Sequence, residues 1–234
     1  MLRNSVTFAA AAAIAVVVTL QAQEKPKVQI QIPDPGVPQA MSIEATFVRA
    51  AYNNEGYAII GYQVAQRSLG DEWMMIDLGT TVRSKTPDYD LKREHISVDT
   101  PDGKHIPLAT VEEYRKADVR NIEQRAKVQR DSINYFPPEA TQACRLGFFS
   151  EPNERIMPWD QVELSSRRGC AGRLFFHIPG GIKVGQYFLN EKFAQSTIRV
   201  PFRILTEDEE KMVKKNYKDI RKQVQDAFRP PKKK

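Results

Sequence analysis

The chain has 234 residues, 27% of them charged, and its 35 lysines and arginines exceed its 29 aspartates and glutamates to give a formal net charge of +6. This length supports one substantial core, and all-β domains of this size are commonly single. Much of the positive excess falls in the C-terminal residues and in one charged helix, and the sequence carries no helix-turn-helix, zinc-finger or aromatic RNA-binding signature, which argues against nucleic acid as a partner.

Residues 1–22 have the anatomy of a secretory signal peptide: Arg3, then an apolar run from Val6 to Leu20, then a small residue, Ala22. The alternative is an uncleaved membrane anchor, but the run falls short of the ~20 residues that cross a bilayer. No later segment of the sequence is apolar enough to span a membrane. We therefore expect a cleaved signal and a periplasmic or secreted protein without a transmembrane span.

Residues 23–41 contain four prolines. Proline cannot donate to a sheet ladder, so this segment is interpreted as an extended tether. A docking peptide is the alternative interpretation.

Residues 42–205 predict a mainly β domain. Alternating and β-branched residues over 42–52, 57–66 and 73–83 predict three strands of a meander, joined by short turns rich in Asn, Gly and Ser. After this meander the sequence TPDG, residues 100–103, predicts a hairpin, because proline presets φ and glycine takes the left-handed conformation that closes the loop.

The hairpin turn fixes a register in which Val98 lies opposite Ile106, and Asp99 opposite His105. One face of this hairpin is apolar, and the other is polar. In this register Asp99 can orient the His105 imidazole for acid–base work, so the two residues are the candidate acid–base pair. The favoured alternative is an ordinary surface pair.

At Thr110 the spacing of the apolar residues changes from the alternation of strands to the spacing of a helix. Thr110 and Glu113 form a capping box at this point. The following residues predict a surface helix over about 110–130, with a thin apolar stripe and a basic face of six residues: Arg115, Lys116, Arg120, Arg125, Lys127 and Arg130. A solvated face is the favoured interpretation. Peripheral contact with an anionic polymer or lipid head group is the alternative.

Residues 131–170 contain the candidate binding loop and both cysteines. Because export favours disulfides, Cys144 and Cys170 are predicted to pair, and the sequence gives neither a catalytic signature. Tyr135 and Phe136 stand ahead of two prolines, either as a recognition feature or, as we favour, as a plug against the sheet. The turn-rich segment between the cysteines adds the other candidate binding residues: Trp159, Arg167 and Arg168.

Three closing strands are predicted over residues 172–178, 186–193 and 196–205. Pro201 places the last of them at a sheet edge or at a bulge. A second capping box at Thr206 opens a predicted C-terminal helix over 206–228, whose apolar stripe docks on the domain or, alternatively, forms a short coiled-coil seam. A basic tail follows at 229–234.

The phrases EWMMIDLGTTVRS, LKREHISVDTPDGKHIPLAT, GRLFFHIPGGI and IRVPFRIL resemble the secreted bacterial immunoglobulin-like domains of the telokin-like kind. RDSINYFPP and WDQVELSS are similar to phrases in exported bacterial proteins without an assigned activity. The resemblance covers about two thirds of the mature chain and implies an immunoglobulin-like antiparallel β-sandwich, here with an inserted surface helix and a C-terminal helix. It brings no catalytic residues.

The sequence contains no metal-binding spacing and no P-loop, so no metal or cofactor is expected. The leading hypothesis is a non-catalytic exported module that binds or scaffolds a protein or cell-envelope partner. The alternatives are an envelope hydrolase built on Asp99 and His105, and a protein that binds anionic surfaces. Oligomeric state is left open by the sequence.

Overall fold

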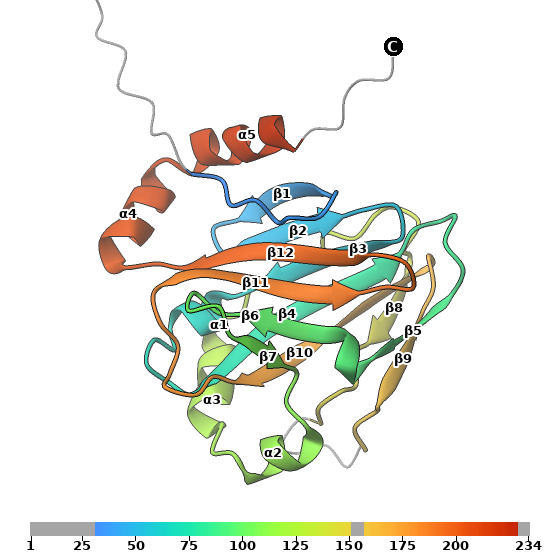
Figure 1. The fold of residues 1–234 in the computed structure, drawn as a ribbon, viewed down its shortest axis with the longest axis horizontal. Coiled ribbons are helices and arrows are strands. Elements are labelled where there is room, and N and C mark those ends of the chain that lie inside the picture. The colour runs from blue at the N-terminus through green and yellow to red at the C-terminus, as the bar shows by residue number, and fades with distance from the viewer. Residues whose placement is uncertain (1–30, 151–156, 229–234) are drawn as a thin grey trace, which may run out of the picture.

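The computed structural model describes residues 31–150 and 157–228, and these residues form a mainly β protein (Figure 1). The expected signal peptide (1–22), the first part of the tether (23–30) and the basic tail (229–234) lie outside the described residues. Within the described ranges, no helix is long and apolar enough to cross a membrane.

The larger sheet begins with a four-stranded antiparallel meander, to which β10 adds antiparallel to β4 and β8 adds parallel to β10. Its strands, in spatial order, are β1 (Ala40–Ala45), β2 (Val48–Tyr52), β3 (Gly56–Gly61), β4 (Trp73–Val82), β10 (Arg168–His177) and β8 (Gln142–Arg145).

The smaller sheet is entirely antiparallel. Its strands, in spatial order, are β12 (Thr197–Ile204), β11 (Gly185–Lys192), β6 (Ile96–Asp99) and β7 (His105–Pro107). A separate antiparallel pair consists of β5 (Tyr89–Lys92) and β9 (Gln161–Leu164), and the short 3-10 turn η1 (Arg93–His95) leads from β5 into β6.

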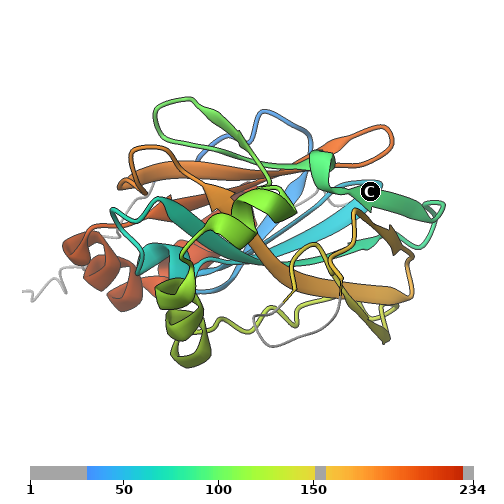
Figure 2. The same cartoon turned by 90° about the horizontal axis from the view of Figure 1, so that it is seen from below.

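The two sheets face each other across one hydrophobic core (Figures 1 and 2). Aromatic rings join the layers where Tyr62, just after β3, packs against Phe202 of β12 with ring centroids 5.2 Å apart, and Phe202 stacks on Tyr187 of β11 at 5.3 Å. A polar link also crosses the core, because the Thr80 hydroxyl of β4 donates to the carboxyl of Glu191 on β11 at 2.6 Å.

The predicted hairpin register is confirmed. Val98 pairs with Ile106 and Asp99 pairs with His105, and Gly103 takes the left-handed conformation with φ of 78°. The local turn chemistry of TPDG was therefore sufficient to fix both the loop and the face on which each side chain lies.

Pro201 lies on an edge strand, as predicted, because β12 borders the smaller sheet. Proline removes one N–H from this edge. The side-chain amide of Gln39 bonds both backbone groups of Arg199, accepting from its N–H at 2.9 Å and donating to its carbonyl at 2.7 Å. Edge strands with blocked backbone groups resist pairing with other chains.

The single strand predicted over residues 42–52 is wrong: a turn at residues 46–47 separates β1 from β2. Phe47 and Val48 are consecutive buried residues, which breaks the alternation that the prediction relied on. One nitrogen of the Arg49 guanidinium donates to the carbonyls of Ala45, Thr46 and Val48 at 3.0 to 3.1 Å and so holds the turn closed.

The strand predicted over residues 57–66 ends earlier, at Gly61, and a short helix, α1 (Gln63–Gln66), follows. The side chain of Asp131, distant in sequence, accepts the N–H of Gln63 at 2.8 Å. A carboxylate at the N-terminal N–H groups of a helix is the favourable arrangement, and short-range sequence patterns could not reveal it.

The helix predicted over residues 110–130 is two helices, α2 (Val111–Lys116) and α3 (Arg120–Val128). The predicted capping box is confirmed, with Thr110 Oγ1 accepting from the Glu113 N–H at 3.1 Å and Thr110 N donating to the Glu113 carboxylate at 2.7 Å. At the break, Ala117 takes an extended conformation, the Asp118 carboxylate binds the guanidinium of Arg120 at 2.7 Å, and Val119 is buried.

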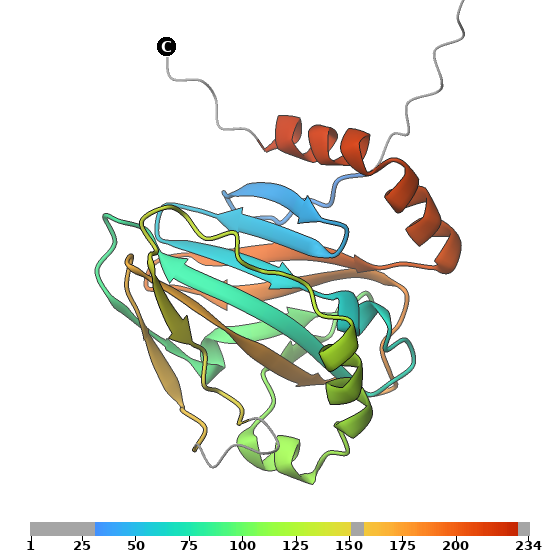
Figure 3. The same ribbon diagram turned by 180° about the vertical axis from the view of Figure 1, so that it is seen from behind.

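The C-terminal helix predicted over 206–228 is likewise two helices, α4 (Glu207–Lys215) and α5 (Tyr217–Ala227), separated at Asn216. Docking onto the domain, the favoured interpretation, is confirmed, since Ile220 and Val224 of α5 form a buried cluster with Ile43 of β1. Figure 3 shows α5 lying along β1.

The predicted disulfide is confirmed: Cys144 and Cys170 are bonded across the parallel pair β8–β10. We expect the double variant Cys144→Ala/Cys170→Ala to lose roughly 3 kcal/mol of unfolding free energy, because the open loop regains chain entropy when unfolded. Equilibrium urea unfolding of the oxidised protein and of the variant measures this difference. A loss below about 1 kcal/mol would contradict it.

The buried carboxyl of Glu191 predicts that the free energy of unfolding decreases as the pH rises. Its side chain is fully buried, and burial raises its pKa from 4.5 to about 8, against the opposing Thr80 hydrogen bond. Above about pH 4.5 the unfolded chain has lost this proton while the folded chain keeps it, so the folded state is progressively disfavoured until the pH reaches about 8.

We expect stability to fall by roughly 2 kcal/mol between about pH 6.5 and 8 in the wild type, and to stay nearly level in Glu191→Gln. Urea unfolding at half-unit pH intervals gives both curves. Asp131→Asn is the matched control, because the Asp131 carboxyl, with a pKa of about 6, has largely ionised at the start of this window. Equal slopes in wild type and Glu191→Gln would refute the assignment.

Candidate functional site

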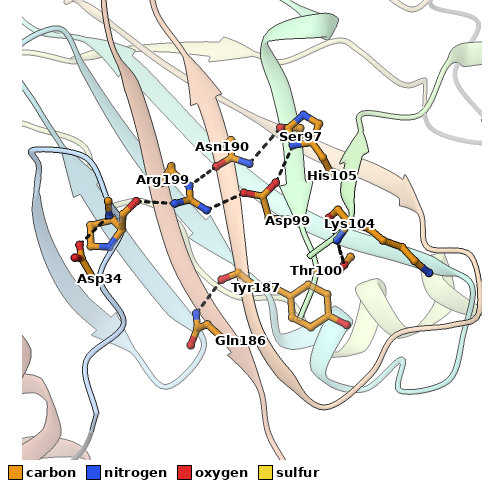
Figure 4. Close-up of polar contacts among 12 residues, drawn as sticks. Asp34, Ser97, Asp99, Thr100, Lys104, His105, Gln186, Tyr187, Asn190 and Arg199 are labelled. Atoms are coloured by element: carbon orange, nitrogen blue, oxygen red, sulfur yellow. Dashed lines mark hydrogen bonds and ion pairs between the residues drawn. The ribbon is translucent and has the colours of Figure 1, made fainter. Parts of the chain in front are cut away.

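The pair predicted from the hairpin is formed: Asp99 Oδ1 and His105 Nδ1 are 2.7 Å apart. The two residues lie on neighbouring strands, β6 and β7, on the outer face of the smaller sheet (Figure 4). The His105 side chain is 67% exposed and the Asp99 side chain 25%. Neither residue lines any of the cavities described below.

Asp99 belongs to a larger polar network. Its other oxygen accepts from Arg199 of β12 at 2.8 Å, and Arg199 also donates to Asn190 at 3.0 Å and to the Pro35 carbonyl at 2.8 Å (Figure 4). The guanidinium lies over the Phe188 ring, 4.3 Å from its centroid. Arg199 therefore ties the segment before β1 to two strands of the smaller sheet.

The electrostatics of Asp99 favour a structural role. Partial burial alone raises the pKa of a carboxyl, but hydrogen bonds from His105, Asn190 and Arg199, with the Arg199 charge, outweigh it and hold the Asp99 pKa below its ordinary value. A carboxylate whose pKa is lowered is a weaker base than an ordinary one.

Tyr135 and Phe136 pack on the outer face of the larger sheet, as the favoured plug interpretation requires. Tyr135 contacts the small buried cluster that contains Ile133. A Cβ placed on Gly79 of β4 or Gly169 of β10 would lie 2.9 to 3.0 Å from the Phe136 ring, so both glycines make room for it. Figure 3 shows the segment after α3 crossing this face.

The other three candidate residues are placed near the two cysteines. Trp159 is 42% exposed, and its ring lies over Gly147. The backbone N–H of Trp159 donates to the Gly147 carbonyl at 2.7 Å. Arg167 has an exposed side chain, and Arg168 is paired with Glu163 at 3.1 Å. The middle of the predicted loop, residues 151–156, lies outside the described residues.

The basic face predicted on the 110–130 segment is largely neutralised within the chain. Four of its six cations are ion-paired: Lys116 with Glu112, Arg120 with Asp118, Arg125 with Asp71, and Arg130 with Asp77. This pairing supports the solvated-face interpretation over an anionic-surface contact.

Besides Glu191, two carboxyls whose pKa is raised by burial were missed from the sequence. Asp77, in the middle of β4, is 1% exposed, and burial raises its pKa despite Arg130 at 3.4 Å and the cross-strand charge of Arg173. Burial also raises the pKa of Asp131 to about 6, with the Asp77 charge adding to the shift. The available signal was a single Asp inside the apolar run WMMIDL, because buried charges in strands need partners.

A cavity of about 280 Å³ lies between α2, α3, the end of β8 and the outer face of β10. We call it the arginine pocket. Its lining includes three guanidinium groups and three aromatic rings: Arg130, Arg145, Arg173, Tyr114, Phe149 and Phe175.

A second cavity, the apolar groove, has a volume of about 550 Å³ and opens between the β1 and β12 edges beneath the C-terminal helices. Its lining is mainly aliphatic and aromatic, and includes Ile32, Ile43, Val200, Phe202, Met212 and Ile220. This volume lies within the range typical of ligand sites.

No family model, no curated protein and no solved structure matches this chain. Among the residues that the structure describes, no group of three or more His, Cys, Asp and Glu side chains is arranged to hold a metal ion.

We expect Arg199→Ala to cost roughly 2 kcal/mol of unfolding free energy, because Asp99 and Asn190 lose a charged donor at partly buried positions. His105→Ala should stay within about 0.5 kcal/mol of wild type, since it removes an exposed partner. Paired urea titrations test both, and a larger cost for His105→Ala than for Arg199→Ala would overturn the structural interpretation of the network.

Proposed function

We propose that the protein is an exported, non-catalytic binding module with an immunoglobulin-like β-sandwich, and that it holds an extended segment of a protein partner in the apolar groove. The observation that carries the proposal is the groove itself. It is the larger of the two cavities described above, and its walls come from both sheets and from the C-terminal helices.

The chemistry of the groove favours aliphatic side chains as its occupants. Ile32, from the segment before β1, already packs against the buried cluster of Ile43, Ile220 and Val224. Part of this chain's own N-terminal segment therefore lines one wall of the groove. A partner segment with alternating aliphatic residues meets the same surface, and each buried methylene contributes about 0.8 kcal/mol.

Recognition through the backbone of β12 is disfavoured, because Pro201 and the Gln39 side chain occupy that edge. Binding by side chains in the groove, with polar contacts at its rim, is the remaining mode. Arg203 and Glu209 line that rim as an ion pair at 2.8 Å. Charged residues at a rim contribute to specificity more than to affinity.

Support for the sandwich comes from the way the chain changes sheets. β4 and β10 neighbour each other in the larger sheet. Of the strands that follow them in the chain, β6, which comes after the separate strand β5, neighbours β11, which comes directly after β10, in the smaller sheet. Crossovers of this kind characterise immunoglobulin-like sandwiches. The Cys144–Cys170 disulfide supports an oxidising compartment outside the cytoplasm.

Site-specific photocrosslinking tests this function. A benzophenone amino acid at Met212, in the groove, should give a discrete protein adduct in envelope extract from the source cells, because its side chain contacts whatever fills the groove. The matched control carries the probe at Lys222, exposed on α5.

Adding Val213→Arg to the Met212 probe variant should abolish the adduct, since a cation then projects into the groove. Thermal unfolding shows whether that variant remains folded. Adducts to lipid alone, or equal protein adducts from positions 212 and 222, would refute the proposal.

A further inference from the structure

The wall of the apolar groove carries a positive charge that the binding of aliphatic side chains does not use. Three charged side chains line the groove: Arg49, Arg203 and Glu209. Arg203 and Glu209 neutralise each other as an ion pair at 2.8 Å. Arg49 therefore gives a mainly apolar groove one excess positive charge.

Arg49 is positioned in this wall by the sheet and by an aromatic ring. It lies near the start of β2, directly opposite Ile43 of β1, and residues paired in this way point to the same face of a sheet. The Arg49 guanidinium lies over the ring of Tyr62, 5.2 Å from its centroid. Ile43 and Tyr62 also line the groove, so the guanidinium stands on a wall made of buried side chains.

Part of the Arg49 guanidinium is available to a ligand. Its Nη1 donates to the carbonyls of Ala45, Thr46 and Val48, which holds the side chain in place. Its Nε and Nη2 make no hydrogen bond to the described residues, and neither is a buried atom, so both have surface open to solvent. The N–H groups of these two nitrogens form one side of the planar fork, which suits a carboxylate in bidentate contact.

None of the ion pairs within the described residues involves Arg49, because the acidic side chains around it bind elsewhere. Glu44 is paired with Arg221 at 3.2 Å, and the Asp131 carboxylate accepts the N–H of Gln63 at 2.8 Å. Burial raises the pKa of Asp131, and the charge of Arg49 opposes this rise, so the two side chains interact through space without forming a pair. The structure thus leaves the Arg49 fork without a carboxylate from the described part of the chain.

We propose that the segment held in the apolar groove presents an acidic side chain, glutamate or aspartate, to Arg49. This inference rests on the proposed function, because it specifies which extended segment the groove selects. Alternate side chains of an extended segment point the same way, so an acidic residue two positions from an aliphatic one faces the same wall. The aliphatic neighbours supply contact area, and the charge-assisted hydrogen bonds to Arg49 supply the selection.

Three peptides that differ in one side chain test the selection: acetyl-Ile-Ser-Xaa-Ser-Ile-amide, with Xaa as glutamate, glutamine or lysine. Their ends are blocked, so the central residue alone sets the charge. Calorimetric titration of the full chain measures each affinity. We expect the glutamate peptide to bind at least about tenfold more tightly than the glutamine peptide, a difference of about 1.4 kcal/mol, and the lysine peptide to bind most weakly. Added salt should reduce the difference, because screening weakens the attraction to Arg49.

Arg49→Gln should remove the preference, so that the glutamate and glutamine peptides bind within about twofold of each other. The ratio of the two affinities is the measured quantity, because Arg49 also holds the turn at residues 46–47, and a disturbed turn weakens both peptides alike. Arg49→Lys retains the charge and should retain a preference for the glutamate peptide.

Arg115→Gln is the matched control, since it makes the same charge change at an exposed position of α2 outside the groove. It should leave the preference of about tenfold intact. Thermal unfolding shows whether each variant is folded, and the peptide series on the unaltered chain tests the selection without any variant.

The outcomes separate this inference from the function on which it rests. Equal binding of the glutamate and glutamine peptides, or equal ratios in Arg49→Gln and Arg115→Gln, would overturn the role of Arg49 and leave the groove as a peptide site. If none of the three peptides binds, the selection and the peptide-binding function are both overturned.

Discussion

The antiparallel pairing of β4 with β10 is the contact on which the rest of the structure depends. It joins the N-terminal meander to the C-terminal half over the eight register pairs from His177–Trp73 to Cys170–Thr80. Its inner face places Thr80 opposite Glu191 in the core, and its outer face places Asp77 beside Arg173. The disulfide then fixes β8 to the far side of β10.

Each cavity lies where helices pack over part of the larger sheet. On the outer face, Phe136 fills the space over Gly79 and Gly169, and the arginine pocket lies further along β10, beside α2 and α3. At the other extreme of the larger sheet, β1 faces β12 only partly, and α5 covers the remainder. Both cavities thus follow from the shape of a twisted layer whose edges are closed by other elements.

Local signals were reliable, and distant ones were not. The TPDG turn, both capping boxes and Pro201 specify their surroundings within a few residues, and the structure agrees with each. The breaks at Asp118 and Asn216, and the end of β3, coincide with side-chain hydrogen bonds that a helical or alternating period does not encode. The Asp77–Arg173 pair needed the strand order, which no local pattern contains.

The two ends of the described chain lie on the same side of the fold. Ile32, near the first described residue, and Phe228, the last one, both pack with the helix α5, while α2 lies at the opposite end (Figure 1). A molecule attached to a surface by either terminus would therefore hold the apolar groove close to that surface and the arginine pocket away from it. The two cavities would then lie at different distances from the surface, so that molecules close to the surface would reach the apolar groove more readily than the arginine pocket.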